Sequence, residues 1–483
     1  MDILRATADP LLFGQHFRGD SWSAWRAFLA VLFGLPLVGQ GSDLVSACTA
    51  RPPTAAGHSR GGPYREAWLV CGRRAGKSFI LATIAVYLAA FHDYRKFLGP
   101  GERATVMVIA VDRRQARTIF RYIVGLLRAA DMLWRLVRRE TSESVELDTG
   151  VVIEVHVASF RTTRGYTVVA ALCDEIAFWA TDDAAAPDYA ILDAIRPAMA
   201  TIPNSMLLCA SSPYAQRGAL YDAFRRYHGK ADAPVLVWHA PTRVMNPSVS
   251  QSVIDQAMER DPASARAEYL AQFRTDVEGF LTREVVEACV SRGVYERPPI
   301  AGVKYFAFAD PSGGSADSFT LAVAHREDDR VVLDAVRERR PPFSPEAVAA
   351  EFAGLVCGYR ASLRGDRYAG EWPREAFRRH GIEYLVAGKD RSAIYVEALP
   401  LFNSGKVDLL DHQRCASQFC QLQRRSGRGR DVIDHPPGGH DDVCNAAAGA
   451  LVMAADRRPQ AVICAPIIVT APLGESRFSH PGW

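Results

Sequence analysis

The fold of this chain is decided by the stretch Ala67-Trp68-Leu69-Val70-Cys71-Gly72-Arg73-Arg74-Ala75-Gly76-Lys77-Ser78. The apolar run that ends at Cys71 predicts a buried strand, and a helix is expected from Ser78 to about Phe91. The turn between them ends in Gly-Lys-Ser, the order of a phosphate-binding loop. Cys71 stands where the usual pattern has its first glycine. The alternative is a glycine-rich turn in which Gly-Lys-Ser occurs by chance.

The composition of this loop suits the phosphates of ATP and a magnesium ion. Backbone amides at the start of a helix attract anions. Lys77 is placed to reach the β- and γ-phosphate oxygens, and Ser78 to bind Mg²⁺. The predicted nucleotide-binding residues are Gly72, Arg73, Arg74, Ala75, Gly76, Lys77 and Ser78.

A second apolar strand, expected at 167–173, ends in two carboxylates. Asp174 is predicted to hold the Mg²⁺ through water, and Glu175 to polarise the attacking water. Two acids at the carboxyl end of a buried strand are costly unless a metal or another partner compensates them. The structural alternative is N-capping of residues 176–179 by Asp174. Together, the loop and this strand predict a nucleotide hydrolase.

Two further segments fit an ATP-driven motor. Residues 209–213 end a strand in small hydroxyl side chains, where a third motif can sense the γ-phosphate and couple hydrolysis to motion. An ordinary strand-exit turn at Pro213 explains them nearly as well. Arg164 is predicted to complete the catalytic site of a neighbouring subunit. A solvated loop arginine is an equal alternative.

Strands and helices alternate over the first part of the chain. Strands are expected at 104–110, 151–157 and 205–210, and helices at 113–127 and 262–273. This alternation predicts a parallel sheet with helices on its faces. We therefore expect an α/β fold that begins with a phosphate-loop ATPase domain of the ASCE/RecA-like type over 1–275. A linker is expected at 276–300.

A second strand-rich block begins at Lys304. Its expected strands are 305–309, 320–325, 331–336, 367–369 and 382–385, and its expected helices are 345–359 and 443–455. Acids stand at the end of the first strand, in the middle of the block and at the opening of the last helix: Asp310, Asp366, Asp441 and Asp442. Glu371 competes with Asp366 for the middle position.

Acids on an opening strand and a late helix are typical of ribonuclease-H-like nucleases, where two divalent metals about 4 Å apart clamp the attacking and leaving oxygens. We expect such a domain over 301–460, followed by an extended tail over 461–483. Asp310, Asp366 and Asp442 are predicted as catalytic ligands of two Mg²⁺ or Mn²⁺ ions. Asp441 is an extra ligand or an orienting neighbour. Alternatively, Asp310 is a turn acid and Asp442 a helix N-cap.

The segment 423–430 is rich in arginine and is expected to be a flexible loop. Its predicted DNA-binding residues are Arg424, Arg425, Arg428 and Arg430, which would grip the backbone without regard to sequence. A solvated basic loop is the alternative. Only six of the 57 basic residues are lysines. Arginine suits phosphate, but a GC-rich codon bias explains this preference at least as well.

The composition excludes several other classes of protein. With 48% hydrophobic and 23% charged residues the mix is that of a globular protein. The ten cysteines form no C-x-x-C pair, which excludes a zinc ribbon or a thioredoxin-like site. The longest early apolar run, 27–38, is too short to span a bilayer, and Asp2 and Asp9 argue against a signal peptide. We expect a soluble protein of the reducing cytoplasm with a net charge of +3.

Four motifs together resemble the large terminase subunit of tailed bacteriophages: the loop 72–78, Cys173-Asp174-Glu175, the segment 310–314 and His440-Asp441-Asp442. The resemblance covers residues 9–455. It implies an N-terminal ATPase that drives double-stranded viral DNA into a preformed capsid and a C-terminal nuclease that cuts the concatemer. It also implies a small terminase subunit, a portal protein and a homopentamer on the procapsid in the host cytoplasm.

The resemblance further implies that Arg73 or Arg74 senses the nucleotide and that an upstream aromatic segment binds adenine. Trp22 and Trp25 are the candidates, although amphipathic-helix packing with Leu29 explains both equally well. Two other functions remain open. One is a host DNA-repair or restriction-type ATP-driven translocase with an inactive ribonuclease-H-like domain. The other is a passive DNA-binding or capsid-associated protein with a vestigial ATPase.

Overall fold

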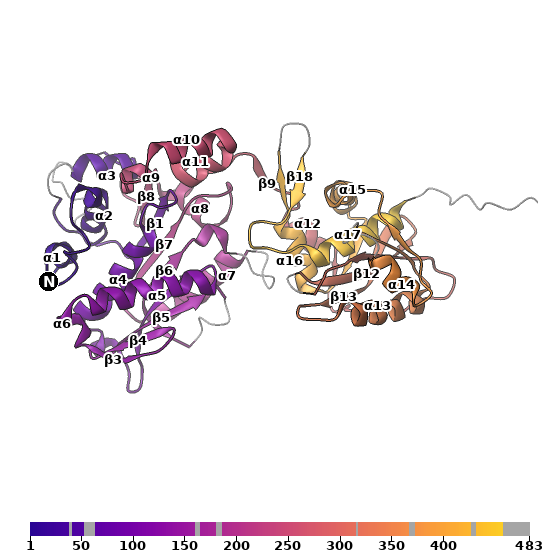
Figure 1. The fold of residues 1–483 in the computed structure, drawn as a ribbon, viewed down its shortest axis with the longest axis horizontal. Coiled ribbons are helices and arrows are strands. Elements are labelled where there is room, and N and C mark those ends of the chain that lie inside the picture. Colours follow the sequence, from indigo (N-terminus) through magenta and orange to yellow (C-terminus); the bar gives the residue numbers. More distant parts are fainter. Residues whose placement is uncertain are drawn as a thin grey trace, which may run out of the picture.

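The computed structural model of the chain describes residues 1–37, 41–52, 63–159, 165–179, 186–314, 317–366, 372–426 and 431–456. Two domains lie side by side along the longest axis, the first coloured indigo to magenta and the second orange to yellow (Figure 1). Each domain is a sheet covered by helices. The predicted α/β class is therefore confirmed.

The first domain is built on an eight-stranded sheet with the order β3-β4-β5-β2-β6-β7-β1-β8. Neighbouring strands are parallel from β5 to β8, and β3 and β4 add an antiparallel edge. Strand β7 lies between β1 and β6, so the strand that ends in residues 209–211 separates the strand before the loop from the strand that ends in Asp174. The strands are β1 (Glu66–Cys71), β2 (Ala104–Ala110), β3 (Val137–Glu140), β4 (Ser144–Leu147), β5 (Val151–Val157), β6 (Thr167–Asp174), β7 (Met206–Ser211) and β8 (Leu236–Ala240).

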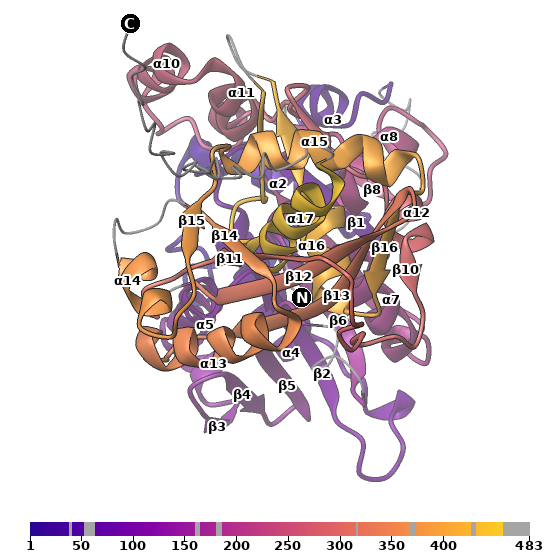
Figure 2. The same cartoon turned by 90° about the vertical axis from the view of Figure 1, so that its right-hand side faces the viewer.

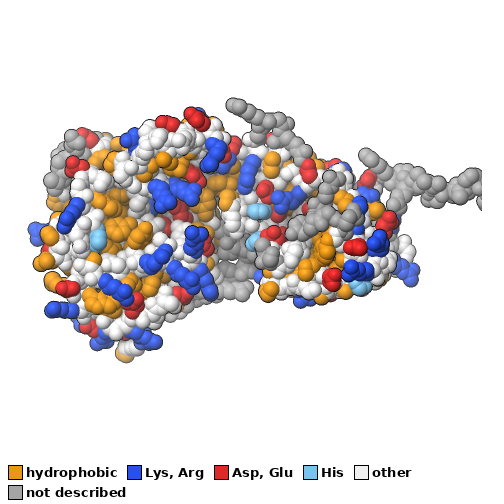
Figure 3. Space-filling model, viewed as in Figure 1, with side chains coloured by type: hydrophobic (Ala, Val, Ile, Leu, Met, Phe, Trp, Pro, Cys, Tyr) orange, Lys and Arg blue, Asp and Glu red, His pale blue; other side chains and the backbone are white. Residues whose placement is uncertain are grey.

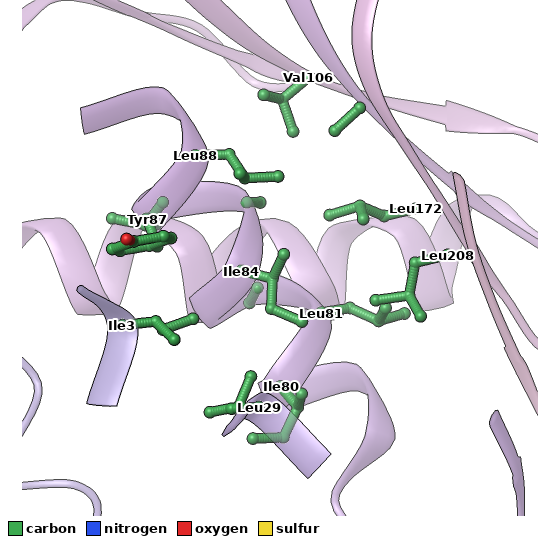
Figure 4. Packing of buried hydrophobic residues seen from close by; sticks show 14 of the residues in the cluster. Ile3, Leu29, Ile80, Leu81, Ile84, Tyr87, Leu88, Val106, Leu172 and Leu208 are labelled. Carbon is green, nitrogen blue, oxygen red and sulfur yellow. The ribbon is translucent and has the colours of Figure 1, made fainter. Parts of the chain in front are cut away.

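Helices cover both faces of this sheet. In β1, Leu69 belongs to the core beneath α2, α4 and α5, whereas Trp68 and Val70 belong to the core beneath α7 and α8. Burial on both faces explains why the strands are continuous apolar runs. Figure 4 shows Leu81 of α4 directed toward Leu172 and Leu208 of the sheet. The helices are α1 (Ile3–Ala8), α2 (Ser23–Leu32), α3 (Gly41–Thr49), α4 (Lys77–Phe91), α5 (Arg113–Arg128), α6 (Asp131–Trp134), α7 (Pro187–Met199), α8 (Gly218–Tyr227), α9 (Thr242–Met245), α10 (Gln251–Arg260) and α11 (Pro262–Leu270), with 3-10 turns η1 (Asp20–Trp22), η2 (Arg95–Phe97) and η3 (Ile176–Phe178).

The second domain has a seven-stranded mixed sheet with the order β10-β16-β13-β12-β11-β14-β15. Strands β11, β12 and β13 form an antiparallel meander, and β14 and β15 continue from β11 as parallel strands. This topology confirms the ribonuclease-H-like part of the predicted fold. The strands are β10 (Val290–Ser291), β11 (Tyr305–Asp310), β12 (Phe319–Glu327), β13 (Arg330–Arg339), β14 (Ser362–Gly365), β15 (Tyr384–Val386) and β16 (Val407–Leu410).

Helix α17 (Asp442–Ala455) packs against β11 and β12 on one face of this sheet, and α13 covers the other face (Figure 2). Gly449 permits the close approach, because a Cβ atom there would lie 2.2 Å from Cγ of Phe308. The first turn of α17 is thereby brought to the end of β11. The remaining helices are α12 (Arg283–Ala288), α13 (Pro345–Tyr359), α14 (Trp372–Arg378), α15 (Arg391–Asn403) and α16 (Gln413–Gln421).

Two expectations about connections were wrong. The segment 276–300, expected as a linker, contains β9 (Val277–Gly279), α12 and β10, and Val286 is fully buried in the core of the second domain. The segment 423–430, expected as a loop, begins with β17 (Gln423–Arg425), which pairs with β18 (Val432–Asp434) and with β9. Strands β9 and β17 are short and mostly polar, and they pair with each other although they lie far apart in the sequence.

The other elements expected from periodicity agree with the structure to within a few residues. The middle strand of the second domain is an exception: it lies at Ser362–Gly365, whereas the predicted 367–369 is outside the described residues. The predicted tail 461–483 is also outside them. In the part of the chain that the structure describes, no helix has the length and apolar character that a membrane span needs.

Candidate functional site

The loop between β1 and α4 is held from outside by α9 and its neighbours. The Thr242 hydroxyl donates to the carbonyl of Arg73 at 2.8 Å, and the Asn246 amide donates to the carbonyl of Arg74 at 2.8 Å. Gly72 is required by the same packing, because a Cβ atom there would lie 2.2 Å from Oγ1 of Thr242. The loop backbone is therefore fixed by the fold itself.

The two tryptophans of the N-terminal segment lie on this loop and on the helix that follows it. The indole N–H of Trp25, a residue only 1% exposed, donates to the carbonyl of Ala75 at 2.8 Å. Trp22 packs on Phe79, with 5.6 Å between ring centroids. Packing thus accounts for Trp25, as the alternative interpretation expected. Adenine contact by Trp22 stays a prediction.

Lys77 begins α4 and is buried beside the loop. Its Nζ donates to the carbonyls of Cys71 and Gly72 at 3.0 and 3.1 Å. The same atom lies 3.4 Å from Oε1 of Glu175. The ammonium group is therefore fixed between the loop and the acid, where a phosphate oxygen can replace the carbonyl contacts.

Asp174 is fully buried at the end of β6, beside the loop. Its Oδ2 accepts from Ser78 Oγ at 3.0 Å and from Gln115 Nε2 at 2.7 Å. Its Oδ1 is buried without a hydrogen-bond partner in the described part of the chain. Burial, together with the charge of Glu175, raises the pKa of Asp174 to about 6. An unpartnered carboxylate oxygen beside a serine hydroxyl fits Mg²⁺, which prefers such oxygen ligands.

Glu175 is oriented by the third motif, at the end of β7. Its Oε2 accepts from Ser211 Oγ at 3.0 Å, and from the backbone N–H and hydroxyl of Ser212 at 3.0 and 3.2 Å. Its φ of +50° lies in the left-handed region, which is uncommon for a residue with a Cβ. Neither acid provides a cap to η3, where Glu175 occupies the N-cap position without a side-chain hydrogen bond. The capping alternative therefore has no support in the geometry.

The predicted functional arginines of the first domain differ in their surroundings. Arg73 forms an ion pair with Glu268 at 3.0 Å, whereas the exposed Arg74 forms no ion pair with any described residue. Nucleotide sensing by either one stays a prediction. Arg164 lies outside the described residues.

In the second domain, Asp310 and Asp366 are brought together by neighbouring parallel strands. Asp310 ends β11, and Asp366 directly follows β14. Both carboxylates accept from the Nδ2 atom of Asn445 in α17, at 2.8 Å from Asp310 and 2.7 Å from Asp366. Sequence analysis missed Asn445. Glu371 lies outside the described residues.

The adjacent acids at the start of α17 have different environments. Oδ1 of Asp441 accepts from Arg391 at 2.8 Å, and its Oδ2 accepts from the Tyr395 hydroxyl at 3.0 Å. Asp442 has a buried Oδ2 with no hydrogen-bond partner among the described residues. Asp441 occupies the N-cap position without a side-chain cap bond, so capping explains neither acid. This geometry assigns Asp441 an orienting contact and leaves Asp442 available to a cation.

Burial and neighbouring acids disfavour the charged forms of the carboxylates in this cluster, Asp310, Asp366 and Asp442. Burial and the charge of Asp366 raise the pKa of Asp310 well above its ordinary value, and burial raises that of Asp366. Burial and the neighbouring Asp441 raise the pKa of Asp442 to about 6. Oδ1 of Asn445 is also buried without a partner in the described ranges. Unpartnered oxygens among like charges fit a divalent cation.

Ligand atoms of the three predicted metal-binding acids, Asp310, Asp366 and Asp442, do not all lie within 4.8 Å of one another. Among the described residues the one group of His, Cys, Asp and Glu side chains that meets this distance is Asp434, His435 and Asp441. Two acids of that group, Asp434 and Asp441, already form ion pairs with the guanidinium group of Arg391.

Two of the predicted DNA-binding arginines, Arg424 and Arg425, lie in β17 of the sheet β18-β17-β9, at the root of a hairpin between the domains (Figure 1). Arg424 is 3.6 Å from Asp431, and Arg425 donates to the carbonyl of His435 at 3.0 Å. Both are half-buried and engaged within the fold. Arg428 and Arg430 lie outside the described residues. Figure 3 shows further Lys and Arg side chains over the first domain on the same face.

One side chain joins the third motif to this hairpin. The Tyr214 hydroxyl, two residues after Ser212, donates to Oε1 of Gln423 in β17 at 2.8 Å. Residues of both domains also line a cavity of about 240 Å³ there. A residue that closely follows the third motif is therefore in contact with the first strand of the hairpin.

No family model and no curated protein matches the chain. Among solved structures it is similar to the large terminase of bacteriophage HK97, with 18% identity, a TM-score of 0.38, and coverage of 89% of this chain and 99% of that one. It is similar to the large terminase of a thermophilic bacteriophage in complex with ADP, with 12% identity, a TM-score of 0.36, and coverage of 80% and 93%. It is also similar to the large terminase nuclease of the thermophilic phage G20c with bound magnesium, with 17% identity, a TM-score of 0.31, and coverage of 35% and 96%.

Proposed function

We propose that this chain is the large subunit of a phage terminase, an ATPase that moves double-stranded DNA into a procapsid and a nuclease that cuts the concatemer. The observation that carries the proposal is the presence of two separate acidic sites in one chain. One lies beside a phosphate loop with a lysine, and the other lies in a ribonuclease-H-like sheet. Neither a simple ATPase nor a simple nuclease needs both.

In the ATPase site the chain supplies the groups that ATP hydrolysis requires. Lys77 stabilises the β- and γ-phosphate oxygens, and Glu175, held by Ser211 and Ser212, orients the attacking water as general base. Ser78 and Asp174 would hold Mg²⁺, which neutralises charge on the phosphates when bound. Any change at Glu175 reaches Tyr214 through the strand end that carries the two serines, and from there reaches Gln423.

In the nuclease site Asp310, Asp366 and Asp442 would hold the divalent metals. Bound metals activate a water and stabilise the leaving oxygen of a phosphodiester. Asp441 orients the start of α17 through its contacts with Arg391 and Tyr395. The arginines of the hairpin would bring the DNA backbone to this site.

The proposal includes partners and an assembly. Double-stranded DNA is the substrate, a small terminase subunit selects it, and a portal protein receives a homopentamer of this chain on the procapsid in the host cytoplasm. Arg164 would then serve the ATP site of the adjacent subunit. Mixing Lys77→Ala with Arg164→Ala chains should restore part of the ATPase activity, because the two lesions lie on different sides of one interface.

A reciprocal pair of variants tests the proposed function. Lys77→Ala should abolish DNA-stimulated ATP turnover and retain Mn²⁺-dependent nicking of plasmid DNA, and Asp310→Asn should do the opposite. If the wild-type chain turns over ATP but does not nick DNA with Mn²⁺, a translocase with an inactive ribonuclease-H-like domain is favoured instead. If it does neither, the proposal fails.

A further inference from the structure

Asn445 lies at the centre of the carboxylate cluster on the same face of α17 as Asp442, because the two residues are three apart in a helix. Its side chain is fully buried. Its Nδ2 atom donates to Asp310 at 2.8 Å and to Asp366 at 2.7 Å. One neutral amide thus joins two acids at the ends of two neighbouring strands of the second sheet.

The other half of the same amide has no partner. Oδ1 of Asn445 is buried and accepts no hydrogen bond from the described residues. Such an oxygen is costly to bury, whereas divalent cations such as Mg²⁺ and Ca²⁺ take oxygen ligands that include asparagine carbonyls. Because both atoms belong to one planar group, a half-turn of the amide exchanges them in front of Asp310 and Asp366.

A purely structural role would give a different pattern of contacts. Gln418 of α16 shows that pattern at the start of α17: it is buried, and its Oε1 accepts from the backbone N–H groups of Val443 and Cys444, each at 3.0 Å. The half of its amide that has no partner among the described residues is the donor Nε2, which cannot bind a cation. Gln418 therefore caps the start of α17. Asn445 makes its contacts with acids of the cluster and not with the helix backbone.

We propose that Asn445 is a positioning residue that serves the nuclease site in two orientations. Its N–H groups hold Asp310 and Asp366 together when no cation is bound, and its carbonyl oxygen turns to a bound divalent cation. A neutral side chain performs both tasks without adding a fourth negative charge to the cluster. This inference rests on the proposed nuclease function.

The test uses the full-length chain without nucleotide and measures Mn²⁺ binding by calorimetry and the melting temperature in EDTA. Asn445→Ala should bind Mn²⁺ about tenfold more weakly, in the range found when supporting contacts of metal ligands are removed. Asn445→Asp should melt at a lower temperature in EDTA and bind Mn²⁺ about tenfold more tightly, because it adds a charged ligand. Gln418→Leu is the matched control, with a lower melting temperature and unchanged Mn²⁺ affinity.

Wild-type Mn²⁺ affinity in both Asn445 variants would overturn the inference, as would an equal loss of affinity in Gln418→Leu. If Asn445→Ala does not fold, the nearly isosteric Asn445→Asp decides the question. Asp310→Asn identifies which part of the measured binding belongs to the nuclease site. If that variant binds Mn²⁺ like the wild type, the nuclease part of the proposed function fails, and not the role of Asn445 alone.

Discussion

The two acidic sites of the chain compensate their charges in different ways. In the first domain, Glu175 forms an ion pair with Lys77 and accepts hydrogen bonds from two serine hydroxyls and one backbone N–H. In the nuclease domain, Asp310 and Asp366 share one neutral amide, and the nearby Arg391 is bound to Asp434 and Asp441.

This difference separates one acid, Glu175, whose carboxylate is held by donors of the protein, from the acids Asp310 and Asp366, which have one neutral amide between them. Fixed donors from Lys77 and from the end of β7 hold the Glu175 carboxylate in place. The nuclease acids repel one another, and their pKa values rise because burial and like charges disfavour ionisation. Removing the Glu175 carboxylate should therefore cost stabilising contacts, whereas removing the Asp310 carboxylate should relieve repulsion.

The largest effect is expected from Glu175→Gln. Loss of the general base should slow ATP turnover by about 10³-fold while nucleotide binding is retained. The melting temperature of the variant should fall slightly, because Lys77 loses its charged partner. Steady-state ATPase assays and fluorescent-nucleotide binding measure the two properties.

A matched acid on the same sheet serves as the control for this variant. Glu66 begins β1, at the opposite end of that strand from the loop, and pairs with Arg196 at 2.9 Å. Glu66→Gln should keep the wild-type turnover. Undiminished ATPase activity in Glu175→Gln would show that another group is the base.

Asp310→Asn should have the opposite structural effect. We expect cleavage of plasmid DNA to fall by roughly 10²-fold or more, because the metals that would stabilise the developing negative charge lose one of their protein ligands. In EDTA the variant should melt at a higher temperature than the wild type, since one of the repelling charges is gone. Mg²⁺ should stabilise the wild type more than the variant.

Thermal melting with and without Mg²⁺, together with a nicking assay, measures these effects. Asp329→Asn is the control, because Asp329 is an exposed acid of the same domain whose ion-pair partner is Lys406 at 3.3 Å. It should change neither property. A lower melting temperature for Asp310→Asn in EDTA would contradict the repulsion on which the comparison depends.

The comparison also shows what local sequence can predict. The phosphate loop, the acids at the end of β6 and the acid at the end of β11 each stand where an apolar strand ends, so strand-end patterns reveal them. Asn445 and Gln115 carry no such pattern. Asn445 lies 135 residues from Asp310, and Gln115 lies 59 residues from Asp174.

Strand pairing over long distances explains the errors in the fold. Strand β9 was missed because its three residues acquire partners only when β17 lies beside them. The arginine-rich β17 was expected as a loop because it has no apolar alternation of its own. Short polar strands form because neighbouring strands pair with them, and the local sequence pattern carries no information about those neighbours.

Asp441 and Asp442, at the start of α17, allow the same comparison between an acid held by donors of the protein and an acid with fewer of them. Both oxygens of Asp441 accept hydrogen bonds, from Arg391 and Tyr395, whereas Oδ2 of Asp442 accepts none from the described residues and lies 3.9 Å from Nδ1 of His440. Asp441→Asn should lower the free energy of unfolding by about 1 kcal/mol, because it weakens the contact with Arg391, which is more than a third exposed and keeps Asp434 as a partner. Asp442→Asn should leave that free energy unchanged or raise it.

Urea unfolding in EDTA measures both variants. An Arg391→Ala background should remove most of the effect of Asp441→Asn, since the two residues act as a pair. Equal destabilisation by Asp441→Asn and Asp442→Asn would remove the distinction between the orienting and the metal-binding acid.

The smallest expected effect concerns two histidines. The one in the second domain contacts a carboxylate, whereas the one in the first domain packs among other rings. In the nuclease domain His325 contacts both oxygens of Asp334 at 2.8 and 2.9 Å. In the ATPase domain the ring of His228 stacks on Phe224 and lies 5.4 Å from the ring of His239. Burial and the neighbouring His239, with Arg51 also nearby, lower the pKa of His228 to about 4.

A lowered pKa means that the folded state favours the neutral ring of His228. Its contribution to stability is full above the ordinary value of 6.5 and is lost as the pH falls from 6.5 toward 4. Because the ring is only half-buried, solvent screening reduces this contribution to about 1 kcal/mol. His228→Phe should flatten the stability of the full chain over this pH range in urea titrations, whereas His16→Phe should not, because His16 is less enclosed. An unchanged acid slope in His228→Phe would assign the acid sensitivity to the acidic clusters instead.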